Sequence, residues 1–284
     1  MILHMNARNL IIGCVIALGL LAAGCGQQTG WLLKPVPIDE SLQETVVAED
    51  EGWIIRDKIA LVDVDGLLMN ARDRGFWGTQ DNPVSLFIEK LQKAVSDDAV
   101  KAIVVRINSP GGGVTASDIM YQYLLEVRRQ RSVPVVAVIE DVGASGGYYV
   151  ACGADHIIMH PTSVTGSIGV IVQTISLART MDMIGINAEA VTSGPFKDLA
   201  SPLKPLQERD LAVLQKMVDG FHARFVGVIR EGRPGLSDAE VRELTDGRIF
   251  TGEEAVEVGL GDEVGYVDTA IVRAKQLAGV ERVK

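Results

Sequence analysis

The sequence predicts an α/β protein with a largely parallel sheet, and three observations indicate it. Short apolar runs rich in β-branched residues alternate along the chain with longer segments of helical periodicity. Hydrophobic residues make up 47% of the 284 residues and aromatic residues only 5%, which suits an aliphatic core. Two glycine-rich turns each follow a predicted strand and precede a predicted helix. This alternation is typical of parallel strands that are joined by helices.

The expected elements follow one another in a regular order from Lys58 onward. Strands are expected at 58–68, 101–113, 133–140, in pieces within 156–171, and at 188–194. Helices are expected at 82–100, 115–130, 147–155, 176–186 and 205–233. Segment 238–279 is expected to be helical with turns.

A targeting signal precedes this body. Arg8 gives a positively charged start, and the apolar run 10–24 has the length of a signal peptide and is short for a membrane span. The run ends in "LAAGC", which resembles the bacterial lipobox in which the cysteine, here Cys25, is lipidated. Leu21 lies four residues before Cys25, whereas the usual pattern has leucine three before it. The alternative is an uncleaved membrane anchor, and either interpretation places the body outside the cytoplasm at a membrane.

The chain is therefore expected to have three parts. Residues 1–24 are predicted to be a lipoprotein-type signal peptide, 25–55 a polar and acidic tether, and 56–284 the functional domain. The net charge of −10 argues against a nucleic-acid partner, whose binding would need a basic surface. The three cysteines have neither metal-ligand spacing nor a plausible disulfide framework.

Ser145 is the first candidate catalytic residue. It lies in "GASGGYYVACGAD", between the predicted strand 133–140 and the predicted helix 147–155. Small neighbours allow a sharp turn and close approach of another molecule, and free N–H groups at a helix N-terminus can hold an anion. The same pattern also suits a small residue needed only for helix–sheet packing. The rest of the chain has to decide between these interpretations.

A second glycine-rich turn, "INSPGGGV" at 107–114, occupies a similar place after the preceding strand. If the two turns lie side by side, the N–H groups of Gly111 or Gly112 and of Gly146 can point at one oxygen atom, as in an oxyanion hole. The alternative is a plain turn, since "SPGG" is a strong turn former. The turn is not a phosphate-binding loop, because the lysine of that pattern is missing.

A nucleophilic serine needs a base, and the histidines offer no supported one. His4 lies in the signal segment, His156 and His160 flank a predicted strand, and His222 lies within a predicted helix. None has an acidic partner in a recognisable arrangement, so a Ser-His-Asp triad is unsupported, although sequence order alone does not exclude one.

A lysine is the other option. Lys197 lies in the loop "TSGPFKDLASP", and a lysine drawn into a partly desolvated site can lose its charge and accept a serine proton. An ordinary surface lysine is the default alternative. Ser167, in "VTGSIGV", is placed to hold that lysine in line.

Five motifs together resemble the bacterial SppA-type signal peptide peptidases, in their short form with one catalytic domain. The motifs are "INSPGGG", "ASGGYYVACGAD", "TGSIGV", "SGPFKDLASP" and "DGRIFTGEEAVEVGLGDEVG", in the order and at the spacings of that family. The resemblance covers 58–284. It implies the ClpP/crotonase-type α/β fold, a spiral of ββα units. The lipobox departs from the transmembrane anchor that is usual in the family.

The resemblance also implies roles for the candidate residues. Ser145 matches the nucleophile, Lys197 the general base and Ser167 the serine that hydrogen-bonds the lysine. Gly112 and Gly146 match the oxyanion donors, with Gly111 an equally plausible neighbour. Residues 56–284 would then form a Ser/Lys peptidase domain that needs no metal or cofactor.

The family also suggests partners and surroundings. In short members the dyad is completed across a subunit boundary, which implies a homo-oligomer, with an octamer as the expected form. Cleaved signal peptides and other unfolded chains are the expected substrates, at the extracytoplasmic side of the cell envelope. Two other functions stay open: a relative that cuts one specific membrane protein, and a crotonase-fold acyl-CoA enzyme or non-catalytic scaffold. The signal segment counts against the acyl-CoA enzyme, which would be cytoplasmic and would not need Lys197.

Overall fold

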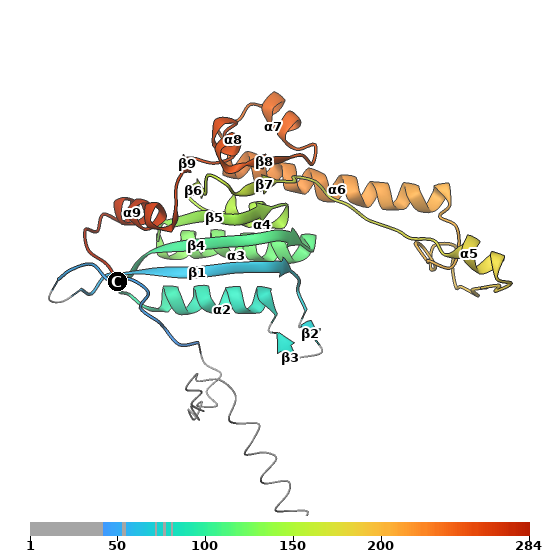
Figure 1. Cartoon of the computed structure of the whole chain (residues 1–284), viewed down its shortest axis with the longest axis horizontal. Coiled ribbons are helices and arrows are strands. Elements are labelled where there is room, and N and C mark those ends of the chain that lie inside the picture. Colours follow the sequence, from blue (N-terminus) through green and yellow to red (C-terminus); the bar gives the residue numbers. More distant parts are fainter. Residues whose placement is uncertain (1–41, 53–54, 72, 76–77, 81) are drawn as a thin grey trace, which may run out of the picture. The chain divides into compact units, whose positions relative to one another are not determined.

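A seven-stranded, mostly parallel sheet forms the centre of the chain from Glu44 to Lys284 (Figure 1). The computed structural model describes residues 42–52, 55–71, 73–75, 78–80 and 82–284. The chain divides into two units, 1–43 and 44–284, and the description below concerns the second. The main strands are β1 (Lys58–Leu68), β4 (Val100–Gly112), β5 (Val135–Ala144), β6 (His156–Met159) and β9 (Glu263–Val264), neighbours in that order and all parallel.

Two short strands extend the sheet beside the end of β5. Strand β7 (Val164–Gly166) pairs with β5 in parallel, and β8 (Ile249–Thr251) pairs with β7 in the antiparallel sense. A separate ribbon joins β2 (Asp73–Gly75) to β3 (Gly78–Gln80). The predicted fold class, an α/β protein of ClpP/crotonase type with a parallel sheet, is confirmed.

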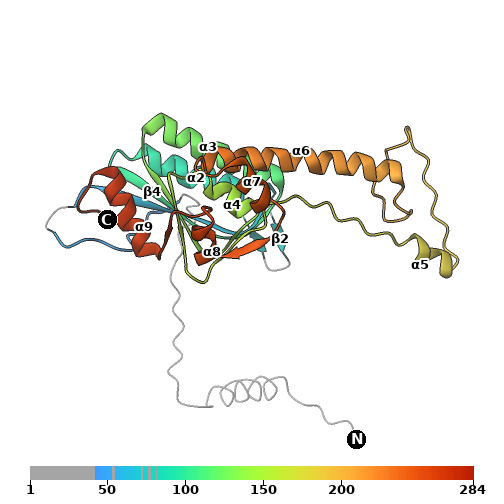
Figure 2. The same ribbon diagram turned by 90° about the horizontal axis from the view of Figure 1, so that it is seen from above.

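Helices cover both faces of the sheet (Figure 2). On one face, alternate strand residues such as Val105 and Ile139 pack against the helices α2, α3 and α4. On the other, Val104 and Val138 pack against Ala270 and Ala274 of α9. Because side chains alternate between the faces of a strand, continuous apolar runs are what a sheet buried on both faces requires. The helices are α2 (Pro83–Ser96), α3 (Val114–Arg131), α4 (Gly146–Ala151), α5 (Ala178–Met183), α6 (Glu208–Gly232), α7 (Asp238–Leu244), α8 (Gly252–Glu257) and α9 (Val267–Ala278).

Side-chain caps fix where several of these helices begin. Asn82 accepts hydrogen bonds from the N–H groups of Val84 and Ser85 at the start of α2, where Pro83 takes the first helical position. Ser237 and Thr251 form capping boxes at the starts of α7 and α8. Within the described ranges, none of the helices is both long and apolar enough to span a bilayer.

An arm leaves the body after β7. Residues 170–207 run outward to α5 and return to α6, whose 25 residues lead back to the sheet (Figures 1 and 2). The strand predicted at 188–194 is wrong, because that segment lies on the arm, where no described strand pairs with it. Val191, in the middle of that segment, is fully exposed.

Residues 44–52, which belong to the predicted tether, lie beside the C-terminal tail. The Asp50 carboxylate accepts hydrogen bonds from Lys275 Nζ (2.6 Å) and from Val283 N–H (2.8 Å). Backbone bonds from Asp50 N–H to the Val283 carbonyl and from Lys284 N–H to the Asp57 carbonyl complete the junction, both at 3.1 Å. Strand β1 therefore begins beside the C-terminal residues.

Arg233 ties the end of α6 to the sheet. Its guanidinium donates to both oxygens of Asp262 (2.7 and 2.8 Å) and to the carbonyls of Gly259 and Gly261. Asp262 in turn accepts from the N–H of Ile157 in β6. Burial alone raises the pKa of Asp262, but the bonds from Arg233 and Ile157 outweigh it and hold the pKa below its ordinary value.

Replacing Arg233 should therefore destabilise the body. Arg233→Met leaves a partly buried carboxylate and two carbonyls without their donor, so the free energy of unfolding should fall by roughly 3 kcal/mol. Arg230→Met is the matched control, since Arg230 pairs with the exposed Asp238, and its effect should stay within about 0.5 kcal/mol. Denaturant unfolding of both variants measures the difference.

The pH dependence separates the ion pair from simple packing. A carboxylate whose pKa is lowered by folding stabilises the folded state above its ordinary pKa, and that contribution disappears as the pH falls through the lowered value. The gap between wild type and Arg233→Met should therefore shrink below about pH 4, the ordinary pKa of an aspartate. An equal gap at neutral pH and well below that value would show that the loss is one of packing alone.

Candidate active site

Ser145 lies at the junction of β5 and α4 in a strained backbone conformation. Its φ is 50° and its ψ is −117°, a region that residues with side chains rarely adopt and that costs about 1–3 kcal/mol. The structure holds it there from both sides: Ser145 N–H donates to the Gly166 carbonyl (2.8 Å), and the Ser145 carbonyl accepts from Tyr149 N–H (2.9 Å). The residue is half-buried. Such strain clusters at active sites, where it presents a side chain at the top of a strand.

The two glycine-rich turns lie against each other without room for side chains between them. A Cβ on Gly111, whose φ is +97°, would come within 2.6 Å of the Gly146 nitrogen. A Cβ on Gly146 would meet Ser117 Oγ at 2.2 Å and the Gly112 nitrogen at 3.2 Å. The backbones of both turns therefore reach the same point beside Ser145, as the sequence predicts for two turns at neighbouring strand ends.

The N–H groups of the first turn have different partners. Gly111 N–H donates to Ser109 Oγ (3.1 Å), and Gly113 N–H donates to the Leu68 carbonyl (2.8 Å). Gly112 lies between them, and it lines the pocket at Ser145 together with Gly146. Of the two residues that the sequence leaves open in this turn, Gly112 is the one that lines the pocket.

Ser109 is a site residue that sequence reasoning missed. It is fully buried, and its hydroxyl donates to the Gly66 carbonyl (2.6 Å) while accepting from Gly111 N–H. Ser109 therefore joins the ends of β1 and β4 and fixes the turn that follows. Its position before proline and glycine indicates only a turn, so the sequence carries no signal for this role.

Ser167 lies beside Ser145. Ala144, the last residue of β5, is paired with Gly166, the last residue of β7, and neighbouring strands lie about 4.8 Å apart. The two serines directly follow this pair. Ser167 also has a positive φ, 49°, and its N–H donates to the Arg248 carbonyl (2.7 Å). The turn of "TDGRIF" therefore holds the second serine from the far side.

Lys197 is not brought to Ser145 within this chain. It lies on the arm, its side chain is exposed, and it is absent from the residues that line the pocket at Ser145. The structure thus brings together Ser145, Ser167, Gly112 and Gly146, but places the lysine on a separate part of the same chain.

The described histidines have partners away from Ser145. His156 starts β6 opposite Val136, at the far end of the sheet from Ser145, and its Nε2 lies 3.3 Å from Glu263. His160 contacts the hydroxyl of Thr162 (3.0 Å), and His222 contacts the carbonyl of Thr245 (2.8 Å). None of these three lines the pocket, and His4 lies outside the described residues.

Two other titratable groups near Ser145 stay protonated. Burial and the hydrogen bond to Asp118 raise the pKa of Tyr149, whose hydroxyl lies 2.5 Å from that carboxylate. Burial raises the pKa of the Cys152 thiol to about 12. Neither group is therefore a base or nucleophile at neutral pH.

The pocket beside Ser145 is small and largely apolar. Its volume is about 20 Å³, room for about one water molecule. The pocket is lined by Gly112, Val114, Ser117, Ser145, Gly146, Tyr149, Gly169, Val170, Phe221 and Phe225. A single chain therefore presents the serine and its neighbours without a space that would enclose a peptide.

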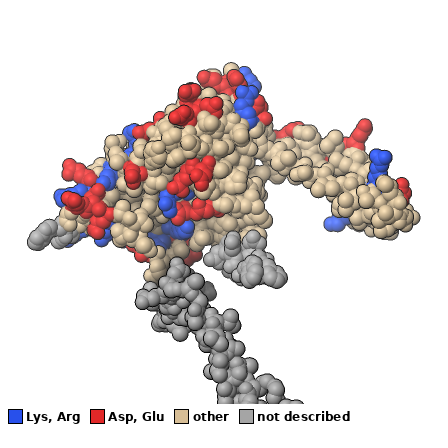
Figure 3. Space-filling model, viewed as in Figure 1, with Lys and Arg blue, Asp and Glu red and all other residues tan. Residues whose placement is uncertain are grey.

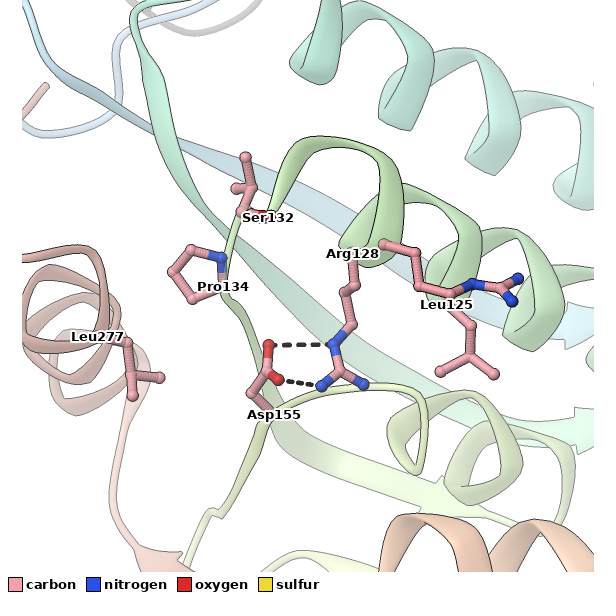
Figure 4. Close-up of a pocket in the computed structure, with 8 residues that line it drawn as sticks. Leu125, Arg128, Ser132, Pro134, Asp155 and Leu277 are labelled. Atoms are coloured by element: carbon pink, nitrogen blue, oxygen red, sulfur yellow. Dashed lines mark hydrogen bonds and ion pairs between the residues drawn. The ribbon is translucent and has the colours of Figure 1, made fainter.

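A larger cavity, about 550 Å³, lies at the opposite end of the sheet (Figure 4). Arg128 and Asp155 form an ion pair across it, and Arg128 also donates to the Gly153 carbonyl (2.8 Å). The Asp155 carboxylate further accepts from Val135 N–H. Because these groups hold the end of α3 against the start of β5, we assign them to the structure and not to catalysis.

Comparisons with known proteins place the chain in a peptidase family. The sequence pattern of Peptidase family S49 matches residues 127–281. A protein of Enterococcus faecium named for the signal peptide peptidase SppA is 32% identical over 219 residues, or 77% of this chain. A Synechocystis sp. protein is 34% identical over 226 residues, which cover 80% of this chain and 76% of the relative. The matched part covers 63% of the Enterococcus protein, so this chain spans less than two thirds of that relative's length.

The fold also matches a solved structure. A mutant of 1510-N, a membrane-bound stomatin-specific protease, superposes with a TM-score of 0.52. The match covers 78% of this chain and 86% of that one at 17% identity, which supports the fold alone.

The contact between the two turns predicts a difference between two glycines. Gly111→Ala and Gly247→Ala both force alanine into a positive φ (+97° and +92°), which costs about 1–2 kcal/mol. Only Gly111 has backbone atoms within 3 Å of the added methyl group, whereas Gly247 has nothing within 4 Å. Gly111→Ala should therefore lower the free energy of unfolding by clearly more than Gly247→Ala. Equal losses in denaturant unfolding would contradict the tight packing of the turns.

Proposed function

Because this chain belongs to peptidase family S49, we propose that it is a serine endopeptidase in which Ser145 and Lys197 form the catalytic dyad. The observation that supports the proposal is the strained Ser145 at the end of β5, with Ser167, Gly112 and Gly146 around it. The described histidines have other partners, and Tyr149 and Cys152 stay protonated. A lysine from the arm is then the base that the motif order supports.

The proposed mechanism is acyl transfer followed by hydrolysis. Lys197, neutral and held by Ser167, accepts the proton of Ser145 as the serine oxygen attacks a peptide carbonyl. The N–H groups of Gly112 and Gly146 stabilise the oxyanion, each by about 3 kcal/mol. Lys197 then returns the proton to the leaving amine, and water releases the acyl group from Ser145. The chemistry requires no metal or cofactor.

The dyad is proposed to form between two copies of the chain. The arm that carries Lys197 points away from its own Ser145, and it and α6 expose many large apolar side chains. They include Ile171, Ile175, Leu177, Met183, Ile184, Ile186, Val191, Phe196, Leu203, Leu206, Leu211, Met217 and Phe221. Uncharged residues make up most of the visible face of the arm (Figure 3). Apolar surface of this extent marks an interaction site, and repeated head-to-tail contacts close into a ring. We expect a homo-oligomer, with an octamer as the expected form.

The expected substrates are unfolded chains and cleaved signal peptides. A closed ring excludes folded proteins from its interior, and the small apolar pocket at Ser145 favours small apolar side chains next to the cleaved bond. The enzyme is expected at the extracytoplasmic side of the cell envelope, attached through lipid on Cys25. Cys25, the expected signal peptide 1–24 and the first part of the expected tether 25–55, up to residue 41, lie outside the described residues.

Complementation between inactive variants tests the dyad. Ser145→Ala and Lys197→Ala should each abolish hydrolysis of a fluorescent casein and of a synthetic signal peptide by the full chain in detergent. Co-expression of the two variants should restore about a quarter of the sites, those that pair an intact serine with an intact lysine of a neighbour. Lys101→Ala, an exposed lysine at the other end of the sheet, is the control and should keep full activity.

The pH profile and two other outcomes complete this test. Because a lysine accepts a proton only when neutral, wild-type activity should rise with pH. Full activity in Lys197→Ala would exclude the dyad. If both single variants are inactive but assembled, and neither co-expression nor mixing restores activity, then the dyad is not shared between subunits.

Lipid attachment is tested separately. Cys25→Ser should abolish incorporation of radiolabelled fatty acid, because the thiol is the acylated atom. Cys14→Ser is the control. Labelling that persists in Cys25→Ser would exclude the proposed lipid site.

A further inference from the structure

A buried carboxylate lies next to the loop that carries Lys197. Asp210, in the first turn of α6, has no exposed surface. The ammonium of Lys204 lies 3.2 Å from Asp210 Oδ2 and 2.8 Å from Asp198 Oδ1. A buried carboxylate is strongly unfavourable unless cations compensate it. Lys204 is the nearer cation and Arg209 lies 3.8 Å from Oδ1, so Asp210 holds Lys204 in place. Lys204 in turn holds Asp198, the residue after Lys197.

The backbone of the same loop is also fixed. Successive turn bonds run from Lys197 N–H to Gly194, from Leu199 N–H to Phe196 and from Ser201 N–H to Asp198, at 3.0 to 3.2 Å. The loop is joined to the start of α5 by the bond from Leu177 N–H to the Pro202 carbonyl, and by the bond from Ser176 Oγ to the Lys204 carbonyl. The loop is therefore structured within one chain, before any partner is present.

Both neighbours of Lys197 are held while Lys197 itself is exposed. The guanidinium of Arg209 lies over the Phe196 ring, 5.8 Å from its centre, and Lys204 holds Asp198. The bond to Lys204 lowers the pKa of Asp198, and the bond to Asp198 raises the pKa of Lys204. Lys204 therefore stays charged at neutral pH and does not compete as a base, which leaves Lys197 as the lysine that the loop presents outward.

We propose that Lys204, fixed by the buried Asp210, is a positioning residue that holds Lys197 in the orientation needed at Ser145 of a neighbouring subunit. This inference rests on the proposed dyad. As a consequence, Lys197 already has its working orientation before the arm contacts the neighbouring subunit. A displacement of about 1 Å in such a group can cost about 100-fold in rate.

The test compares four variants of the full chain in detergent. Asp210→Asn keeps the shape of the side chain but removes its charge, and Lys204→Met removes the cation. Lys204→Arg restores a cation at the same place. Asp98→Asn, which removes the carboxylate of the exposed Arg131–Asp98 pair, is the matched control. Light scattering reports the assembly, and steady-state hydrolysis of a signal peptide gives kcat and KM.

A positioning role predicts a specific pattern. In assembled Asp210→Asn and Lys204→Met, kcat should fall about 10- to 100-fold with KM changed less than about twofold, because binding does not need the base. Lys204→Arg should recover most of the lost kcat, and Asp98→Asn should match wild type. A network that only stabilised the arm would instead lower the amount of assembled enzyme and leave kcat per assembled site unchanged.

Two results would overturn the inference. One is a wild-type kcat in assembled Asp210→Asn. If Asp210→Asn does not assemble, Asp198→Asn takes its place, because the Asp198 carboxylate is partly exposed. A wild-type kcat in Asp198→Asn then overturns the inference in the same way. The other is an equal loss in Lys204→Arg and Lys204→Met. Lys197→Ala, measured in the same series, keeps the two proposals apart: its activity would exclude the dyad, whereas its inactivity beside an unaffected Asp210→Asn would exclude only the positioning role.

Discussion

The contact between two backbones that lack Cβ atoms is the constraint on which the rest of the site depends. Gly111 and Gly146 approach so closely that a methyl group on either would meet atoms of the other turn or of Ser117. The register of β4 and β5, which pairs Ser109 with Gly143, brings the turns to the same height. Ser145 lies directly before Gly146, in its strained conformation. The sheet is thus the support that keeps Ser145, its neighbour Ser167 and the two glycine-rich turns in one small volume.

The body of the protein was largely predictable because its signals are local. Alternating apolar runs predict β1, β4 and β5, and glycine turns at their ends predict where Ser145 and Gly112 lie. The arm was not predictable in this way. The segment at 188–194 has the composition of a strand but no strand to pair with, and the contacts of Lys204 with Asp198 and Asp210 depend on how the loop folds back on α6. The role of Ser109 was not predictable either, since its hydroxyl donates to the carbonyl of Gly66, which is far away in sequence.

The chain separates two tasks that many serine hydrolases combine in one site. In the proposed mechanism, the sheet carries the nucleophile and the groups that stabilise negative charge, whereas the arm carries the lysine on a loop with its own ion pairs. In the proposed assembly, an isolated chain would hold a serine without a base. Such an arrangement keeps the nucleophile unactivated until copies meet, and it makes the quality of the arm's local structure as important as that of the sheet.

The junction between Asp50 and Val283 has a consequence for the way the two chain ends are used. Residues 44–52 and the C-terminal residues 283–284 meet beside the start of β1. This is the end of the parallel sheet opposite to Ser145 (Figure 1). A reporter domain inserted at either of these two segments would therefore lie at the end of the sheet away from Ser145.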